Sequence, residues 1–244
     1  MQQTTETRSA RTTLVTGATG ELGSAVIEYL AGLGGSVIAV DRPRARDRLA
    51  GLAKLGPLVR AVELDTDHAH AWLDRERWQP DGAVPDGAVL TAGAYAGGKR
   101  LVDEADDATL ARLLESNLTS AYRALSALLK GMLPAGRGSI VLIGSKAAVR
   151  PWESVGSGAY AASKAGLLAL VQSAAAETIG SGVRINAVLP STIDTAPNRK
   201  AMPAADPSAW VSKQSLCDVI GFLLSDASRD VSGALIPVYG SRSV

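Results

Sequence analysis

Short runs of consecutive apolar residues alternate along this chain with longer segments of helical periodicity. Runs of this kind are typical of parallel strands buried on both faces of a sheet. The predicted strands are residues 13–16, 37–40, 59–64, 88–91, 140–143, 185–189 and 234–238, and the clearest predicted helices are 22–33, 110–133, 160–179 and 213–224. The alternation predicts an α/β fold, a Rossmann-type doubly wound sheet of about seven parallel strands with helices on both faces.

The glycines and prolines fall at the predicted turns, and no change of composition divides the chain. We therefore expect one domain over residues 12–244, preceded by a polar, disordered lead-in over residues 1–11. Residues 194–211 contain three prolines and little periodicity. Long irregular segments of this kind often contact ligands, so we expect a substrate loop there.

Composition narrows the class of protein. The 25 Lys and Arg residues nearly balance the 24 Asp and Glu residues, which argues against a strongly basic nucleic-acid binder. The single cysteine, Cys217, allows no internal disulfide, and His68 and His70 have no third ligand of matching spacing, so no metal site is expected. Without an apolar stretch long enough for a bilayer or a signal peptide, we expect a cytoplasmic protein with no membrane partner.

A glycine-rich turn follows the first predicted strand and opens a predicted helix. Its three glycines suit a tight turn, close backbone approach to a pyrophosphate, and close packing of helix on sheet. The free N–H groups at the helix start would face the phosphates of a dinucleotide. The residues expected to bind in this way are Gly17, Thr19, Gly20, Glu21, Leu22 and Gly23.

The end of the second strand bears on the choice between NAD and NADP. Asp41 stands where a carboxylate accepts the ribose hydroxyls of NAD and repels the 2′-phosphate of NADP. Arg42 opens a run of arginines that would instead hold such a phosphate. We favour NAD(H), with NADP(H) as the alternative. Asp65, after the third strand, is expected either to contact the adenine amino group or to cap the following helix.

Tyr160 and Lys164 lie four residues apart on a predicted helix, so they share a face. Ser145 ends the preceding strand, and Asn117 lies inside the long predicted helix. A lysine cation about 4 Å from a phenol would lower its pKa by roughly three units, toward about 7, where it exchanges protons readily. We expect Ser145 to orient the reacting oxygen, and Asn117 either to open its helix for a proton-relaying water or to face solvent.

These motifs, in this order, resemble the short-chain dehydrogenase/reductase family over residues 12–240. The resemblance implies hydride transfer between a nicotinamide and a carbonyl or alcohol, and assembly as homodimers or homotetramers. It places Asn117, Ser145, Tyr160 and Lys164 in the catalytic group, with Tyr160 and Lys164 also at the cofactor. Further cofactor contacts implied by the resemblance are Ala92, Gly93, Pro190, Ile193 and Thr195.

Several stretches, AGAYAGG at 92–98, GSKAAV at 144–149 and LPSTIDTAPNRKAMP at 189–203, resemble the quinonoid dihydropteridine reductases. Substrate contacts are predicted after strands four to six, where crevice ligands bind; packing within the loops is the alternative for Tyr95, Trp152, Met202 and Trp210. The substrate candidates are Tyr95, Lys146, Trp152, Met202 and Trp210.

The sequence therefore predicts an NAD(H)-dependent oxidoreductase acting on a small-molecule ketone or secondary alcohol. Tyr160 would be the acid/base. One alternative is a pterin reductase that resembles the dihydropteridine enzymes. An alternative from a different class is a sensor that binds NAD(P) without catalysis.

Overall fold

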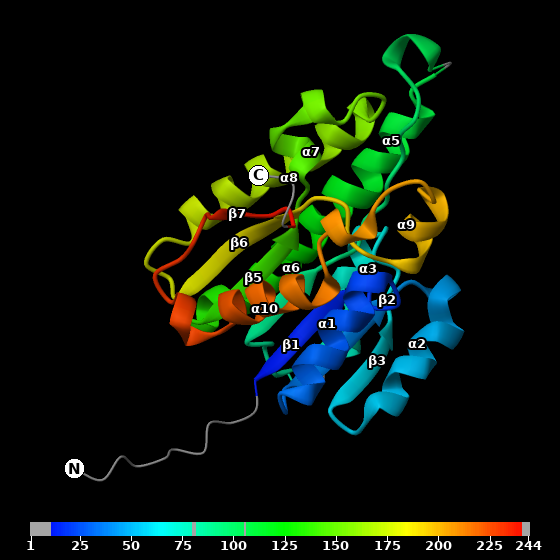
Figure 1. The fold of residues 1–244 in the computed structure, drawn as a ribbon. Helices are drawn as coiled ribbons and strands as arrows, with labels where there is room; N and C mark the ends of the chain where they lie inside the picture. The colour runs from blue at the N-terminus through cyan, green and yellow to red at the C-terminus, as the bar shows by residue number, and fades with distance from the viewer. Residues whose placement is uncertain (1–10, 80–81, 105, 241–244) are drawn as a thin grey trace, which may run out of the picture.

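The computed structural model describes residues 11–79, 82–104 and 106–240, and within them the predicted strands all form. They are β1 (Thr12–Thr16), β2 (Ser36–Asp41), β3 (Val59–Glu63), β4 (Gly87–Leu90), β5 (Gly138–Ile143), β6 (Val183–Pro190) and β7 (Leu235–Val238). All neighbouring strands pair in parallel, in the order β3-β2-β1-β4-β5-β6-β7. The predicted seven-stranded parallel sheet is confirmed (Figure 1).

Helices cover both faces of this sheet because consecutive strand residues point to opposite sides. On one face, Leu14 and Ile140 belong to an apolar core with α3 (Ala69–Leu73), α4 (Arg75–Trp78), α6 (Ser120–Ala135) and α8 (Gly158–Glu177). On the other, Val15 and Val141 pack with α1 (Glu21–Gly32), α2 (Arg46–Leu52) and α10 (Lys213–Leu224). The continuous apolar runs of the strands are thus explained by burial on both faces.

Three further helices lie in the connections: α5 (Ala108–Leu114), α7 (Lys146–Val149) and α9 (Ala196–Ala201). Short 3₁₀ helices occur at Pro43–Ala45, Ala53–Leu55, Leu101–Asp103, Pro151–Glu153, Pro207–Ala209 and Asp226–Ser228. The segment expected to be an irregular substrate loop, residues 194–211, therefore contains α9 and a 3₁₀ turn.

The structure differs in one respect from the single helix predicted over residues 110–133. A five-residue π-helical segment, Glu115–Thr119, joins α5 to α6. A π turn inserts one extra residue and is often found at functional sites. It changes the direction in which its side chains point, and Asn117 lies within it.

Most of the expected lead-in falls outside the described residues. Arg11 is described and is anchored: its carbonyl accepts a hydrogen bond from the N–H of Ser36, and its guanidinium contacts the Leu224 carbonyl and the Asp226 carboxylate. Among the described helices, none has both the length and the apolarity needed to cross a bilayer.

The strand order has a switch point between β1 and β4. From β1 the chain runs outward to β3, then returns across the sheet to β4, which pairs with β1 on its other side. At such a reversal the loops leaving two adjacent strands diverge, and ligands of open α/β sheets bind at the carboxyl ends there. The glycine turn after β1 and the segment after β4 meet at this point.

Candidate active site

The glycine turn after β1 is packed so tightly that side chains would not fit. Gly17 has a φ of +62°, and a Cβ placed on it would lie 2.8 Å from the amide nitrogen of Ala92. A Cβ on Gly23 would lie 2.2 Å from the carbonyl oxygen of Gly17. The turn is therefore held between α1 and the segment after β4.

The start of α1 offers backbone donors beside the switch point. Gly20 is the N-cap and provides no side-chain acceptor. Among the described residues, no oxygen accepts from the N–H groups of Glu21, Leu22 and Gly23. Unpaired N–H groups and the positive end of a helix dipole suit a pyrophosphate, so this turn fits a dinucleotide.

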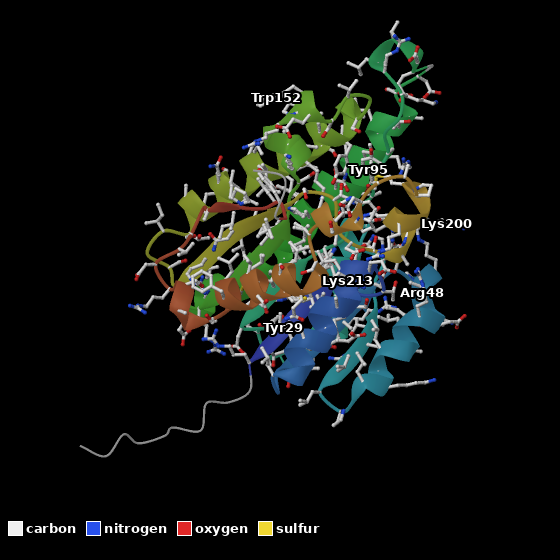
Figure 2. The ribbon with its side chains drawn as sticks, viewed as in Figure 1. Tyr29, Arg48, Tyr95, Trp152, Lys200 and Lys213 are labelled. Atoms are coloured by element: carbon white, nitrogen blue, oxygen red, sulfur yellow. The ribbon has the colours of Figure 1, made fainter. Side chains whose placement is uncertain are left out.

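The side chains of these residues have other partners. Glu21 pairs with Lys213 of α10 (labelled in Figure 2), with 3.1 Å between Oε2 and Nζ. Leu22 is buried in the core. What they can offer a ligand is their backbone N–H.

Asp41, at the end of β2, is tied to the glycine turn. Its Oδ2 accepts from the Thr19 N–H at 2.9 Å and from the Thr19 hydroxyl at 2.8 Å, and its Oδ1 accepts from the Arg42 N–H at 2.8 Å. An ionised carboxylate has about four acceptor positions. Asp41 therefore keeps room for a further hydroxyl, while the Thr19 side chain is occupied by Asp41.

Asp65 does not cap the helix after it, so that alternative is wrong. The N-cap of α3 is His68, and the Asp65 carboxylate lies 2.9 Å from His68 Nδ1. A tight turn, in which the His68 N–H donates to the Asp65 carbonyl, brings these two side chains together. The predicted adenine contact of Asp65 stays a prediction.

The structure brings Ser145, Tyr160 and Lys164 together at the end of β5. Ser145 is the N-cap of α7, where its Oγ accepts from the Ala147 N–H at 3.2 Å. Its hydroxyl lies near enough to Tyr160 of α8 to oppose the increase in the pKa of that phenol. One turn further along α8, Lys164 is buried, and its Nζ donates to the carbonyl of Ile143 at 2.8 Å. The shared face of α8 thus points at the carboxyl end of β5.

The protonation of this group differs from the expectation. Burial raises the pKa of Tyr160; the Ser145 hydrogen bond opposes the increase and Tyr95 adds to it. Burial lowers the pKa of Lys164 to about 8. The expected pKa near 7 for Tyr160 is wrong for this structure, because desolvation of the phenol outweighs the other influences on it.

Asn117 is fully buried, which rules out the alternative that it faces solvent. Its Oδ1 accepts from the Ala94 N–H at 2.7 Å, and its Nδ2 donates to the Ala94 carbonyl and to the Ser163 hydroxyl, both at 3.0 Å. The π-helical segment directs this amide inward. Asn117 thereby holds the segment after β4 against α8.

Gly93 lies where these side chains meet. A Cβ on Gly93 would be 2.8 Å from Asn117 Oδ1 and 3.4 Å from Lys164 Nζ. Next to it, the Ala92 N–H lies 3.4 Å from the Thr16 hydroxyl, its acceptor at the end of β1. The Ala92–Gly93 pair therefore connects the glycine turn to the group around Lys164.

Among the substrate candidates, Tyr95 reaches this centre. Its ring meets that of Tyr160 edge-on, and its hydroxyl lies 3.1 Å from the Ser157 hydroxyl. A Cβ on Gly97 would fall 2.3 Å from the Tyr95 hydroxyl and 2.5 Å from that of Ser157. Sequence reasoning missed Ser157, Gly97 and Ser163. The helix start before Tyr160 was the available signal for Ser157.

The other substrate candidates do not join this group. Trp152 is highly exposed and lies at the outer edge of the molecule, away from Tyr95 (Figure 2). Lys146 pairs with Glu153 at 2.7 Å, with its Nζ 5.3 Å from the centre of the Tyr239 ring. Met202 is exposed just after α9 and Trp210 is half-buried beyond it.

The segment after β6 is ordered by its own contacts. Pro190 is the last residue of β6, Ile193 bridges to Val211, and the Thr195 hydroxyl caps α9 by accepting from the Asn198 N–H at 3.3 Å. The contacts with a nicotinamide carboxamide that the resemblance implies for Ile193 and Thr195 stay predictions. Within the described ranges, no cluster of three or more His, Cys, Asp or Glu residues is arranged to hold a metal ion.

Comparison with known proteins agrees with this architecture. The family model described as short chain dehydrogenase matches residues 11–206. The chain is 33% identical to a cis-4-hydroxycyclohexanecarboxylate dehydrogenase of Sinomonas cyclohexanicum, covering 96% of this chain and 97% of the relative. It is 32% identical to the 3-oxoacyl-acyl-carrier-protein reductase FabG of Pseudomonas aeruginosa, covering 93% and 95%.

A solved structure shows the same fold. The crystal structure of an oxidoreductase of the short-chain dehydrogenase/reductase family from Burkholderia thailandensis superposes with a TM-score of 0.81 at 31% identity, covering 94% of this chain and 91% of that one. The protein therefore belongs to the short-chain dehydrogenase/reductase family of oxidoreductases, which bind NAD or NADP.

Proposed function

We propose that this protein is an NAD(H)-dependent oxidoreductase that interconverts a ketone and a secondary alcohol. The observation that carries the proposal is the meeting of Ser145, Tyr160 and Lys164 at the end of β5, with Asn117 and Gly93 alongside. A hydroxyl, a phenol and an amine at the carboxyl ends of parallel strands form a set of groups suited to proton exchange with a carbonyl or alcohol oxygen.

Tyr160 is the acid/base in this proposal. Its raised pKa keeps the phenol protonated at neutral pH, so its hydroxyl can donate a proton to the oxygen of a ketone. The Ser145 hydroxyl, which lies near enough to influence the pKa of Tyr160, holds the same oxygen in place. A bound nicotinamide would supply or accept the hydride.

Lys164 and Asn117 are both hydrogen-bonded to the backbone around the site. Lys164 is fixed by the Ile143 carbonyl, and its remaining N–H groups can donate to the ribose hydroxyls of a nicotinamide nucleotide. Asn117 fixes Ala94 and Ser163, which keeps the floor of the crevice rigid. A rigid surrounding shell holds reacting groups within the narrow range of geometry that catalysis needs.

The preference for NAD(H) over NADP(H) rests on Asp41. Its carboxylate is anchored at the end of β2 by Thr19 and Arg42, close to the start of α1 where the pyrophosphate fits. A carboxylate held there accepts a hydrogen bond from a ribose hydroxyl and repels a 2′-phosphate. NADP(H) is the alternative cofactor.

The names of two relatives support the substrate class. One names a dehydrogenase of a hydroxycyclohexanecarboxylate and the other a reductase of a 3-oxoacyl group, both consistent with a secondary alcohol or ketone. Reduction of a quinonoid dihydropterin is the second candidate. It is favoured by the AGAYAGG stretch at 92–98, which places Tyr95 against Tyr160.

The test is a panel of ketones, secondary alcohols and quinonoid dihydropterin, followed by NADH absorbance and repeated with NADPH. We expect Tyr160→Phe to remove nearly all turnover while the Kd for NADH stays within about twofold, because the ring is kept and only the hydroxyl is lost. Tyr122→Phe, at an exposed tyrosine on α6, is the matched control and should retain full activity.

Three results would revise this proposal. Full activity of Tyr160→Phe would remove Tyr160 from its role. Turnover of dihydropterin without turnover of ketones would favour the pterin reductase. Tight NADH binding with no turnover on any compound would favour a sensor without catalysis. The dimeric or tetrameric assembly belongs to the same proposal and is measured by light scattering.

A further inference from the structure

Some of the arginines that follow β2 pair with a carboxylate and others do not. Arg42 Nη1 donates to Asp67 Oδ2 at 2.9 Å. Arg46 binds Glu63 through two hydrogen bonds, of 2.7 Å from Nε and 2.9 Å from Nη2. Among the described residues, Arg44 and Arg48 have no acidic partner, and both are exposed (Figure 2 labels Arg48, on α2). Two of the four cations are thus engaged.

Asp67 is itself held in place from a distant part of the chain. Its backbone carbonyl accepts from the guanidinium of Arg123 on α6, and the same guanidinium pairs with Glu115 of the π-helical segment. About a third of each side chain is exposed in the Arg42–Asp67 pair, 30% and 33%. The pair is therefore less screened by solvent than a fully exposed one.

Arg42 is the cation nearest in sequence to the site of cofactor selection. Its own N–H donates to Asp41 Oδ1, so its backbone is fixed beside the carboxylate expected to meet the ribose. A guanidinium next to that ribose would bind a 2′-phosphate through two hydrogen bonds. The Asp67 carboxylate directs the guanidinium toward the segment after β3 and neutralises it.

We propose that Asp67 is a specificity-determining residue that disfavours NADP(H) by holding Arg42. The inference rests on the proposed function, because it concerns which nicotinamide nucleotide the crevice selects. Asp41 repels a 2′-phosphate directly, whereas Asp67 withdraws the cation that would compensate. Selection against NADP(H) is thus shared between two carboxylates after neighbouring strands.

The experiment measures the Kd of NADH and of NADPH by fluorescence titration for the wild type and for Asp67→Asn. The amide keeps the shape of the side chain and removes its charge. We expect the Kd for NADPH to fall about fivefold, the change produced by losing one partly exposed ion pair. The Kd for NADH should change less than twofold, since NADH has no phosphate at this position.

Two further variants serve as controls. Asp230→Asn removes the same charge from an exposed aspartate that pairs with Arg229 near the amino ends of β5 and β6, and should leave both Kd values unchanged. Adding Arg42→Gln to Asp67→Asn should abolish the gain for NADPH, because the released cation is then missing.

Several outcomes would overturn the proposal: an unchanged Kd for NADPH in Asp67→Asn, an equal gain in Asp230→Asn, or a gain that survives loss of Arg42. Loss of NADH binding in Asp67→Asn would also overturn it, because Asp67 would then support the site without selecting the cofactor. A wild-type protein that binds neither nucleotide would overturn the proposed function itself, and this inference with it.

Discussion

The ring of Tyr95 meets the ring of Tyr160 edge-on, with 5.0 Å between the ring centroids and 74° between the ring planes. Tyr95 comes from the segment after β4 and Tyr160 from α8, so the contact joins two elements that lie far apart in sequence. The Tyr95 hydroxyl is fixed by Ser157, the N-cap of α8. We infer that Tyr95 is a positioning residue for Tyr160.

Replacement of Tyr95 tests this relationship. Aromatic pairs contribute about 0.5–1.5 kcal/mol beyond the area they bury, so Tyr95→Ala should lower kcat by up to about tenfold. Tyr95→Phe keeps the ring and should restore most of kcat. Trp152→Ala removes a similarly exposed aromatic ring at the outer edge of the molecule and is the control. Equal kcat values for Tyr95→Ala and the wild type would contradict the positioning role.

The raised pKa of Tyr160 predicts different pH profiles for the two directions of reaction. Burial favours the neutral phenol, the form that donates a proton to a ketone. Ketone reduction should therefore be nearly constant from about pH 6 to 8, below the pKa of the phenol. Alcohol oxidation needs the phenolate and should increase with pH across the same range. Initial rates in each direction, with the folded state checked by circular dichroism, measure this. An oxidation rate that is independent of pH would contradict the prediction.

The buried Lys164 predicts a stability that depends on pH. Its pKa is lowered from 10.5 to about 8 by desolvation. Between these values the unfolded chain carries a proton that the folded chain lacks, so the free energy of unfolding rises with pH through this window, by at most about 1.4 kcal/mol per unit. Below about pH 8 the buried ammonium lowers the free energy of unfolding of the wild type, and Lys164→Met lacks this destabilising group.

Urea unfolding at about pH 7.5, 8.5 and 9.5, one value below this window and two within it, measures the difference. We expect the wild type to gain stability relative to Lys164→Met as the pH rises. Lys130→Met, at an exposed lysine on α6, controls for the general loss of one positive charge. A difference between the wild type and Lys164→Met that stays constant over the three pH values would show that Lys164 is not desolvated as described.

Two glycines of α1, Gly23 and Gly32, allow the same substitution to be compared at a crowded and at an open position. A Cβ at Gly23 would meet the Gly17 carbonyl oxygen at 2.2 Å, whereas a Cβ at Gly32 would meet no heavy atom within 4 Å. Gly23→Ala should therefore destabilise the fold by about 2 kcal/mol or more and weaken NADH binding, because the clash is with backbone. Gly32→Ala should be neutral or slightly stabilising. Thermal unfolding and NADH titration compare them, and similar behaviour of the two variants would contradict the packing described for the turn.

Local pattern was sufficient for the strands and for α1, α8 and α10. Apolar runs located the seven strands to within one or two residues, because strands covered on both faces are mostly apolar along their length. The predicted helix over residues 213–224 matches α10. The irregular composition of residues 194–211 did not reveal α9, since a six-residue helix is fixed by its cap and its tertiary contacts more than by periodicity.

The sequence by itself determined the individual strands, the glycine turn and the shared face of Tyr160 and Lys164, because each depends on residues close together in the chain. Only the tertiary structure decided where Asn117 points and that Asp67 holds Arg42. It also decided that burial, and not the charge of Lys164, dominates the pKa of Tyr160. Desolvation and ion pairing depend on groups that folding brings together from distant segments, and no local pattern records them.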